Sequence, residues 1–174
     1  MDIQRKSGVV VLVLLLAAAC GGNSADQPAD TMGTNGEVGQ ILLRNVYLSA
    51  SGDDGYEAGD DGRVRLWLFN RSSTADALVD VRSAAARSAR ITWDRDCDGV
   101  FEPVDELPVR ADGTVPYDRP YAVDLVDFTG EVHGGTTVPL TFTFRHAGET
   151  RLDAMVEVVG DGDVADPTAC DQGS

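Results

Sequence analysis

The sequence contains a single lysine, Lys6, so nearly all of its cationic side chains are arginines. Of its 174 residues, 14 are Lys or Arg and 29 are Asp or Glu, which gives a formal net charge of −15. An acidic surface is repelled by nucleic-acid phosphates and by anionic lipid headgroups. We therefore expect no nucleic-acid partner, and any attachment to a membrane must depend on something other than charge.

Histidine is also scarce, and the sequence lacks the common catalytic motifs. Its two histidines, His133 and His146, do not lie in a nucleophile motif. There is no Gly-x-Ser-x-Gly, no His-Glu-x-x-His and no phosphate-binding loop, the motifs that place a nucleophile, a zinc ion or a nucleotide. A hydrolytic triad needs a histidine oriented beside its nucleophile. We predict that the protein is not an enzyme.

Long apolar runs are absent except near the N-terminus, where Val9–Leu16 follows the basic pair Arg5 and Lys6. This run is too short to span a membrane comfortably. It continues into Ala17-Ala18-Ala19-Cys20, small residues followed by a cysteine, as in a lipobox. We predict a lipoprotein signal peptide at residues 1–19 and lipidation of Cys20. Ala17 stands where a leucine is typical, and an ordinary signal peptide is the alternative.

The rest of the chain divides into a tether, one domain and a tail. Residues 20–37 begin with the lipidated cysteine and are rich in Gly, Ser, Asn, Asp and Pro, which predicts a flexible tether. Residues 38–160 form the predicted domain, and residues 161–174 form an acidic tail. We expect the protein at the cell membrane, held by its lipid on the extracytoplasmic face, with another envelope protein as a candidate partner.

Cysteine is limited to Cys20 and the pair Cys97 and Cys170. An even pair in an exported chain favours a disulfide. The bond would close a loop of 74 residues, from 97 to 170 inclusive, and contribute roughly 4 kcal/mol by the chain-entropy account. It would also tie the acidic tail back to the domain. Two free thiols are the alternative.

Alternating apolar residues in Pro120–Gly160 predict three strands and the centre of the core. The first strand starts at Tyr121, the second covers residues 138–144, and the third follows a turn at residues 146–149. Burial of each large side chain on the second strand would contribute roughly 1.5–3 kcal/mol. The predicted inward residues are Tyr121, Val123, Leu125, Val138, Leu140, Phe142, Phe144, Leu152, Ala154, Val156 and Val158.

Further short strands are predicted throughout the domain, at Arg63–Phe69, Ala77–Ser83, Arg90–Trp93 and Glu106–Arg110. In the strand predicted nearest the N-terminus, Ile41 and Leu43 occupy odd positions and Val46 and Leu48 even ones. The alternation of apolar residues therefore shifts by one residue at Arg44-Asn45, which indicates a bulge. The longest stretch with a helical period is Ser83–Ala89. This pattern favours an all-β fold: an antiparallel β-sandwich with an immunoglobulin- or cupredoxin-like Greek key and about seven to nine strands.

An acidic hexapeptide, Asp94 to Gly99, has the opening pattern of a calcium loop, with Asp at alternate positions followed by Gly. The candidate oxygen ligands are Asp94, Asp96, Asp98, Glu102 and Asp105. Two features oppose this interpretation: the preceding residues read as strand rather than helix, and Pro103 interrupts the second half. The alternative is an acidic hairpin tip closed by the disulfide.

Residues 135–158, with Val-Pro-Leu-Thr-Phe-Thr-Phe at 138–144 and Ala-Gly-Glu at 147–149, resemble the PCu(A)C-type periplasmic copper chaperones and related actinobacterial lipoproteins. Leu68-Phe69-Asn70, followed by Ala75–Leu78 and Val81, is similar to an earlier strand, turn and strand of that family. The resemblance extends over about Ile41 to Val159. It implies the fold of that family.

The same resemblance implies that the copper ligands have been lost. Family members hold copper with His and Met, which suit this metal, and these include a His-x-Met triplet. Ala122-Val123-Asp124 stands at the triplet here, and the earlier histidine falls near Trp93 or Asp94. No methionine lies between Met32 and Met155, and His133 and His146 match positions that are not ligands. We therefore expect no copper at these positions.

The leading hypothesis is a lipid-anchored, non-catalytic binding or scaffold module of copper-chaperone-like fold, with no cofactor. Two alternatives remain open. One is divalent-metal binding, with calcium in the acidic loop, and the other is a copper chaperone with relocated ligands.

Overall fold

The computed structural model describes residues 33–49, 55–96, 98–115 and 120–158. All regular structure in these ranges is β-strand, and no helix there is long and apolar enough to cross a membrane. The strands are β1 (Thr34–Val38), β2 (Ile41–Leu48), β3 (Gly55–Tyr56), β4 (Gly62–Asn70), β5 (Asp76–Arg82), β6 (Ala86–Trp93), β7 (Glu102–Val104), β8 (Leu107–Val109), β9 (Thr114–Val115), β10 (Tyr121–Phe128), β11 (Val132–His133), β12 (Thr137–Phe144) and β13 (Gly148–Val156).

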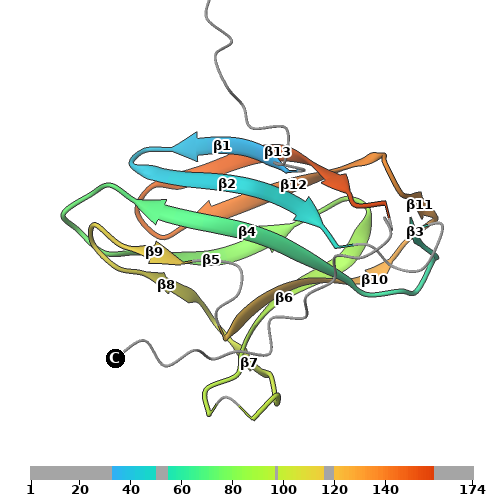
Figure 1. The fold of residues 1–174 in the computed structure, drawn as a ribbon, viewed down its shortest axis with the longest axis horizontal. Helices are drawn as coiled ribbons and strands as arrows, with labels where there is room; N and C mark the ends of the chain where they lie inside the picture. The colour runs from blue at the N-terminus through green and yellow to red at the C-terminus, as the bar shows by residue number, and fades with distance from the viewer. Residues whose placement is uncertain (1–32, 50–54, 97, 116–119, 159–174) are drawn as a thin grey trace, which may run out of the picture.

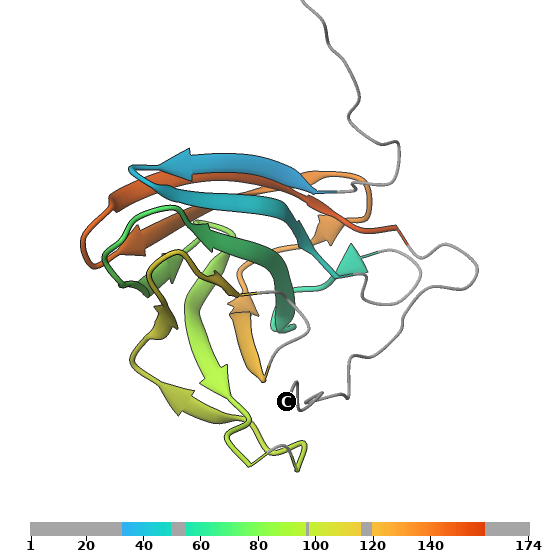
Figure 2. The same ribbon diagram turned by 60° about the vertical axis from the view of Figure 1, so that its left-hand side comes forward.

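Eleven strands form one continuous sheet in the order β7-β6-β10-β4-β2-β13-β12-β5-β8, with β1 beside β2 and β9 beside β4 (Figure 1). The sheet curls around its own apolar face, so β5, near one end of this order, packs close to β6, near the other (Figure 2). The small strands β3 and β11 form a separate pair. The prediction of an all-β sandwich is confirmed. One pairing departs from the antiparallel rule, because β13 runs parallel to β2.

The core follows the predicted alternation on β12 and β4. On β10, Ala122 and Asp124 are buried as well as Val123 and Leu125, and Tyr121 is only half-buried. Along β12, Val138, Leu140, Phe142 and Phe144 are all buried, and the residues between them are more exposed. Strand β4 buries Val64, Leu66 and Leu68 in the same way and lies between β10 and β2. Val158 was predicted to point inward, but it is 58% exposed because β13 ends at Val156.

The bulge predicted in β2 is confirmed at Asn45. The register of β2 against β4 shifts between Arg44 and Tyr47, and Asn45 has a φ of 51°. Asparagine tolerates this left-handed conformation better than most residues. The extra residue turns both Leu43 and Val46 into the core although they lie an odd number of positions apart.

Two expectations need correction. Strand β1 lies mostly within the predicted tether (20–37), because residues 34–37 have no apolar pattern and become a strand only by pairing with β2. Gly36 permits this, since a Cβ there would lie 2.3 Å from Leu152 Cδ2. The number of described strands is thirteen rather than seven to nine, because several strands have only two or three residues.

Several predictions fall outside the described residues: the signal peptide (1–19), Cys20, Cys97, Cys170 and the acidic tail (161–174). They remain predictions from the sequence.

Tyr56 closes the core at the end of β10. Its side chain is buried, its ring stacks on Phe128 with centroids 4.7 Å apart, and its hydroxyl donates a hydrogen bond to the Ser49 carbonyl. Burial, together with the nearby Glu157 carboxylate, raises the pKa of Tyr56 from 10.0 to about 12. The folded domain therefore holds this proton more tightly than the unfolded chain does.

We predict that this difference destabilises the domain in alkaline solution. Between pH 10 and 12 the tyrosine is ionised when the chain is unfolded but still protonated when it is folded. The stabilisation is complete below pH 10 and is lost as the pH rises through 12, by about 3 kcal/mol for two pKa units. Urea unfolding at pH 8, 10 and 11.5 should show this loss in the wild type and a flatter profile in Tyr56→Phe. Parallel profiles would contradict the assignment.

Candidate functional site

The strand positions where the family resemblance places copper ligands lie side by side at one end of β6 and β10. In the antiparallel register of these strands, Trp93 faces Tyr121, Thr92 faces Ala122 and Arg90 faces Asp124. The Asp94 amide also donates to the Pro120 carbonyl at 2.7 Å. The fold thus retains the geometry that would bring ligands from 93–94 and 122–124 together, and the site depends on what these side chains are.

An aromatic stack occupies the outer end of this region. The Trp93 and Tyr121 rings are nearly parallel, at 15°, with centroids 5.1 Å apart. The Arg95 guanidinium lies over the Trp93 ring, 4.3 Å from its centroid, as in a cation–π contact. Burial raises the pKa of Tyr121, and Arg95 and Arg110 partly offset this effect. At neutral pH the stack therefore offers a neutral phenol and a cation, and neither is a donor suited to copper.

Asp124, at the third position of the triplet, is held between two arginines. Its Oδ1 lies 2.5 Å from Arg63 Nε on β4, and its Oδ2 lies 3.7 Å from Arg90 Nε on β6. The Asp124 side chain is only 11% exposed, while those of Arg63 and Arg90 are 34% and 47% exposed. Both carboxylate oxygens thus face guanidinium groups, and this cross-strand row joins three neighbouring strands on the outer face of the sheet.

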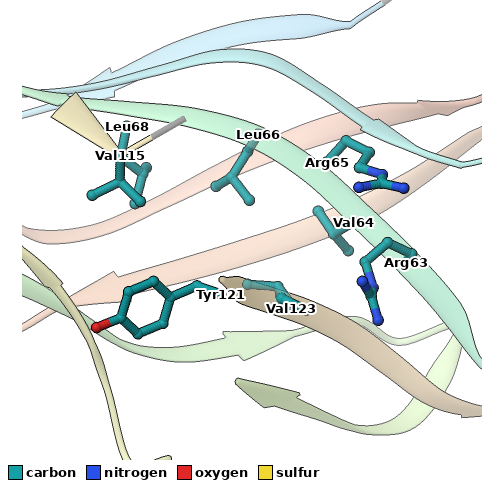
Figure 3. Close-up of a pocket in the computed structure, with 9 residues that line it drawn as sticks. Arg63, Val64, Arg65, Leu66, Leu68, Val115, Tyr121 and Val123 are labelled. Carbon is teal, nitrogen blue, oxygen red and sulfur yellow. The ribbon is translucent and has the colours of Figure 1, made fainter. Parts of the chain in front are cut away.

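Between β4 and β10 the sheet opens into a small hollow, which we call the mouth (Figure 3). The two strands pair only over residues 62–64 and 123–125 and then diverge, with Val115 of β9 pairing with Leu68. Its volume is about 20 Å³, which is room for about one water molecule. It is lined by Arg63, Val64, Arg65, Leu66, Leu68, Val115, Tyr121, Ala122 and Val123.

The predicted calcium ligands are arranged as a turn. The buried Asp94 carboxylate accepts hydrogen bonds from the amides of Asp98 (3.1 Å) and Gly99 (2.9 Å), and Asp98 accepts from Val100. Asp96, Asp98, Glu102 and Asp105 are exposed. Among the described residues, no group of three or more His, Cys, Asp or Glu side chains is placed to hold a metal ion. Asp94 therefore has a structural role in this turn, and calcium binding stays a prediction.

The two histidines are separated by the full length of β12, because His133 precedes this strand and His146 follows it. The exposed His133 ring lies 3.7 Å from the Glu131 carboxylate, and the His146 amide donates to Asp76. Met155 is opposite Thr137, at the His133 end. His133 and His146 are therefore not placed to share one ion, as a copper site relocated onto both would require.

Sequence reasoning missed Arg63, Arg90, Arg95 and Tyr121 as members of this region. Each looks like an ordinary surface or core residue along the chain, and only the cross-strand register brings them together. The alternation along β4 indicates that Arg63 points away from the core, but it does not indicate that Asp124 of β10 lies opposite.

We predict that the row through Asp124 stabilises the fold measurably. Asp124→Ala should lower the free energy of unfolding by about 1–3 kcal/mol, because a largely buried, charge-assisted contact is lost. Asp80→Ala is the matched control: Asp80 pairs with Arg82 at 3.0 Å, but both side chains are about half exposed, so its loss should be about 0–1 kcal/mol. Equal losses in urea unfolding would contradict the assignment.

The calcium hypothesis has a direct test. Calcium added to chelator-stripped protein should raise the melting temperature, and Asp96→Ala should abolish that rise. Asp94→Ala should lower the melting temperature even in chelator, because the amides of Asp98 and Gly99 lose their acceptor. A wild-type melting temperature that does not respond to calcium would dismiss the hypothesis.

Comparison with known proteins places this architecture in context. The family model of the LpqE-like lipoproteins matches residues 41–156. A search of curated protein sequences gives no match.

The fold is similar to three solved PCuAC-type structures. A copper-bound PCuAC domain from PmoF2 is 24% identical, with a TM-score of 0.61 over 72% of this chain and 99% of the domain. An apo PCuAC domain from PmoF1 is 23% identical, with a TM-score of 0.60 over 72% and 100%. The solution structure of CuI-DR1885 from Deinococcus radiodurans is 19% identical, with a TM-score of 0.53 over 71% and 80%. At these identities the likeness extends to the fold alone.

Proposed function

Because the chain belongs to the LpqE-like lipoprotein family, we propose that it is a lipid-anchored, non-catalytic binding or scaffold module on the extracytoplasmic face of the cell membrane. Lipidated Cys20 supplies the anchor in this proposal, and the β-sandwich presents a surface to an envelope partner. The fold it shares with PCuAC domains serves as the framework of that surface.

One observation carries the proposal that the module works without copper at the position that the PCu(A)C resemblance assigns to the metal. The strand ends that would contribute the ligands hold the Trp93–Tyr121 stack and an Asp124 carboxylate between Arg63 and Arg90. Cuprous ion is soft and prefers sulfur and imidazole donors. A carboxylate that two guanidinium groups already neutralise is a hard donor with little remaining charge to offer.

The proposal that it is not an enzyme is supported by the same region. The mouth is large enough for about one water molecule, so it has no space for a substrate. The groups around it are arginines, aliphatic side chains and a phenol whose pKa is raised. None of these is poised to exchange a proton near neutral pH.

The anchor is tested by detergent phase separation of cells that express the full-length chain. We expect the wild type in the detergent phase and Cys20→Ser in the aqueous phase, because the variant cannot receive a lipid. Asp171→Asn is a control that should stay in the detergent phase. A wild type found in the aqueous phase would refute lipid anchoring.

The absence of a tight copper site is tested by titrating Cu(I) against a competing chelator. We expect the wild type to bind no more tightly than the double variant His133→Ala/His146→Ala, since neither histidine belongs to a shared site. A tight single equivalent in the wild type that this variant loses would overturn the proposal in favour of relocated ligands.

A further inference from the structure

A second hollow lies on the outer face of the sheet, where β4 ends beside the start of β2 and beside β9 (Figure 1). Its volume is about 330 Å³, in the range of about 300–1,000 Å³ that is usual for ligand pockets. We call it the arginine hollow. The mouth shares none of its residues. The hollow is lined by Leu42, Arg44, Phe69, Asn70, Arg71 and the turn at residues 112–114.

The cross-strand register gives the hollow an apolar floor between two cations. Phe69 is opposite Leu42 of β2 on one side and opposite Thr114 of β9 on the other. Residues directly opposed in this way share a face of the sheet, with Cβ atoms about 5 Å apart. Arg71 follows Phe69 at the next outward position, and Arg44 lies one outward position away in the other direction along the strands. The Phe69 ring therefore has an arginine at each end.

Backbone hydrogen bonds hold the walls of the hollow in place. The Asn70 amide donates to the Gly113 carbonyl at 2.9 Å, and the Asp112 amide donates to the Ser72 carbonyl at 2.9 Å. The Asn70 side chain is buried, and its Oδ1 accepts from the Ser72 amide at 2.8 Å. The turn after β4 and the turn before β9 are thus fastened to each other. A partner would meet a formed site, which lowers the cost of ordering on binding.

The Arg44 guanidinium is also held before any partner arrives. Its Nη1 donates to the Gly36 carbonyl at 2.7 Å and to the Leu43 carbonyl at 2.8 Å. These bonds use one of its three nitrogens, and the N–H groups on Nε and Nη2 remain for another acceptor. A carboxylate is the acceptor that a guanidinium binds with the best geometry, because two parallel hydrogen bonds can form.

The charges of the two arginines are not compensated within the described part of the chain. Arg90 and Arg145, on other parts of the sheet, form ion pairs with carboxylates. Arg44 and Arg71 form none with any residue that the structure describes. The chain has 29 acidic and 14 basic side chains, so composition alone would favour a carboxylate beside each arginine. Asp112 is the one acidic residue in the lining, and it lies on the β9 side, across Phe69 from Arg44.

We propose that the arginine hollow binds an acidic segment of an envelope protein, with one apolar side chain resting on Phe69 and flanking carboxylates on Arg44 and Arg71. This inference rests on the proposed binding function and names its surface and its class of partner. Arginine and aromatic residues carry much of the binding energy of protein interfaces. The Trp67 ring stacks on Phe69 with centroids 6.1 Å apart and extends the apolar floor along β4.

The test uses a synthetic peptide, acetyl-Glu-Glu-Phe-Glu-Glu-amide, titrated into the isotope-labelled mature chain, residues 20–174 with Cys20→Ser, and followed by NMR. We expect saturable shifts of the amides of Leu42, Phe69 and Thr114. Binding should weaken as salt is added, because charges on both partners are screened. A peptide with Gln in place of each Glu should bind more weakly, and so should one with Ala in place of Phe.

Variants of the chain locate the binding energy. Arg44→Gln/Arg71→Gln should raise the Kd of the peptide by about five-fold or more, since two charge-assisted contacts are lost. Arg71→Gln alone should also raise the Kd, and it removes no contact that holds the fold. Arg87→Gln is the matched control, because it removes the same charge from a 72% exposed position on β6. Asp112→Asn should bind more tightly, since a carboxylate leaves the rim and asparagine tolerates the φ of 47° at this position.

The outcomes that overturn the proposal are distinct from a failure of lipid anchoring, because the peptide is measured on a chain that carries no lipid. Absent or unsaturable shifts would overturn it, and so would an equal loss in Arg87→Gln and Arg71→Gln. Peptide binding that Asp112→Asn weakens would contradict the assigned charge pattern. A dimer that Arg71→Gln dissociates would assign the hollow to a second copy of the chain instead.

Discussion

The contact between Arg63 and Asp124 holds a short seam of the fold. Strands β4 and β10 pair over three residues on each side, and this ion pair lies at the centre of that short seam. The seam joins β6, β7 and β10 to the rest of the sheet and closes the core where Val64 and Val123 meet. Because the Asp124 carboxylate is largely buried, removal of its cationic partners would leave a poorly solvated charge. The position that the resemblance assigns to a metal ligand is thus part of the framework.

The chemistry of the donors distinguishes this framework role from that of a copper ligand. A copper ligand must keep an electron pair available to the metal, whereas Asp124 shares its charge with two guanidinium groups. Likewise, the stacked Trp93 and Tyr121 fill the strand ends with ring surface. A β-sandwich of this kind tolerates such replacements, since its stability comes from inward residues such as Leu140 and Phe142. The same fold can therefore support different surfaces.

Much of the fold was predictable from alternation alone. Period-two patterns located β4, β10 and β12, and a parity change located the bulge at Asn45. Strand β1 was not predictable, because its residues carry no apolar signal and its pairing with β2 is a tertiary effect. The parallel placement of β13 was equally hidden, since alternation does not report strand direction.

The site was less predictable than the fold. The triplet Ala122-Val123-Asp124, to which the resemblance assigns a ligand position, could be located by counting along the chain. The role of Asp124 could not be predicted, because it depends on register with β4 and β6 together. In the acidic loop, the local motif suggests a set of metal ligands. In the structure, the Asp94 carboxylate instead accepts hydrogen bonds from two amides of its own turn.

The position of β13 has a consequence for how the chain matures. The last strand in the sequence is inserted between β2, the second, and β12, its immediate predecessor. Until residues 148–156 are available, β1 alone covers this edge of β2, at residues 41–46, and Tyr47 and Leu48 lack their partners from β13. A growing chain therefore cannot complete its sheet early, and its long-range contacts form late and slowly. Such a chain can complete its sheet only when synthesis of the last strand is finished.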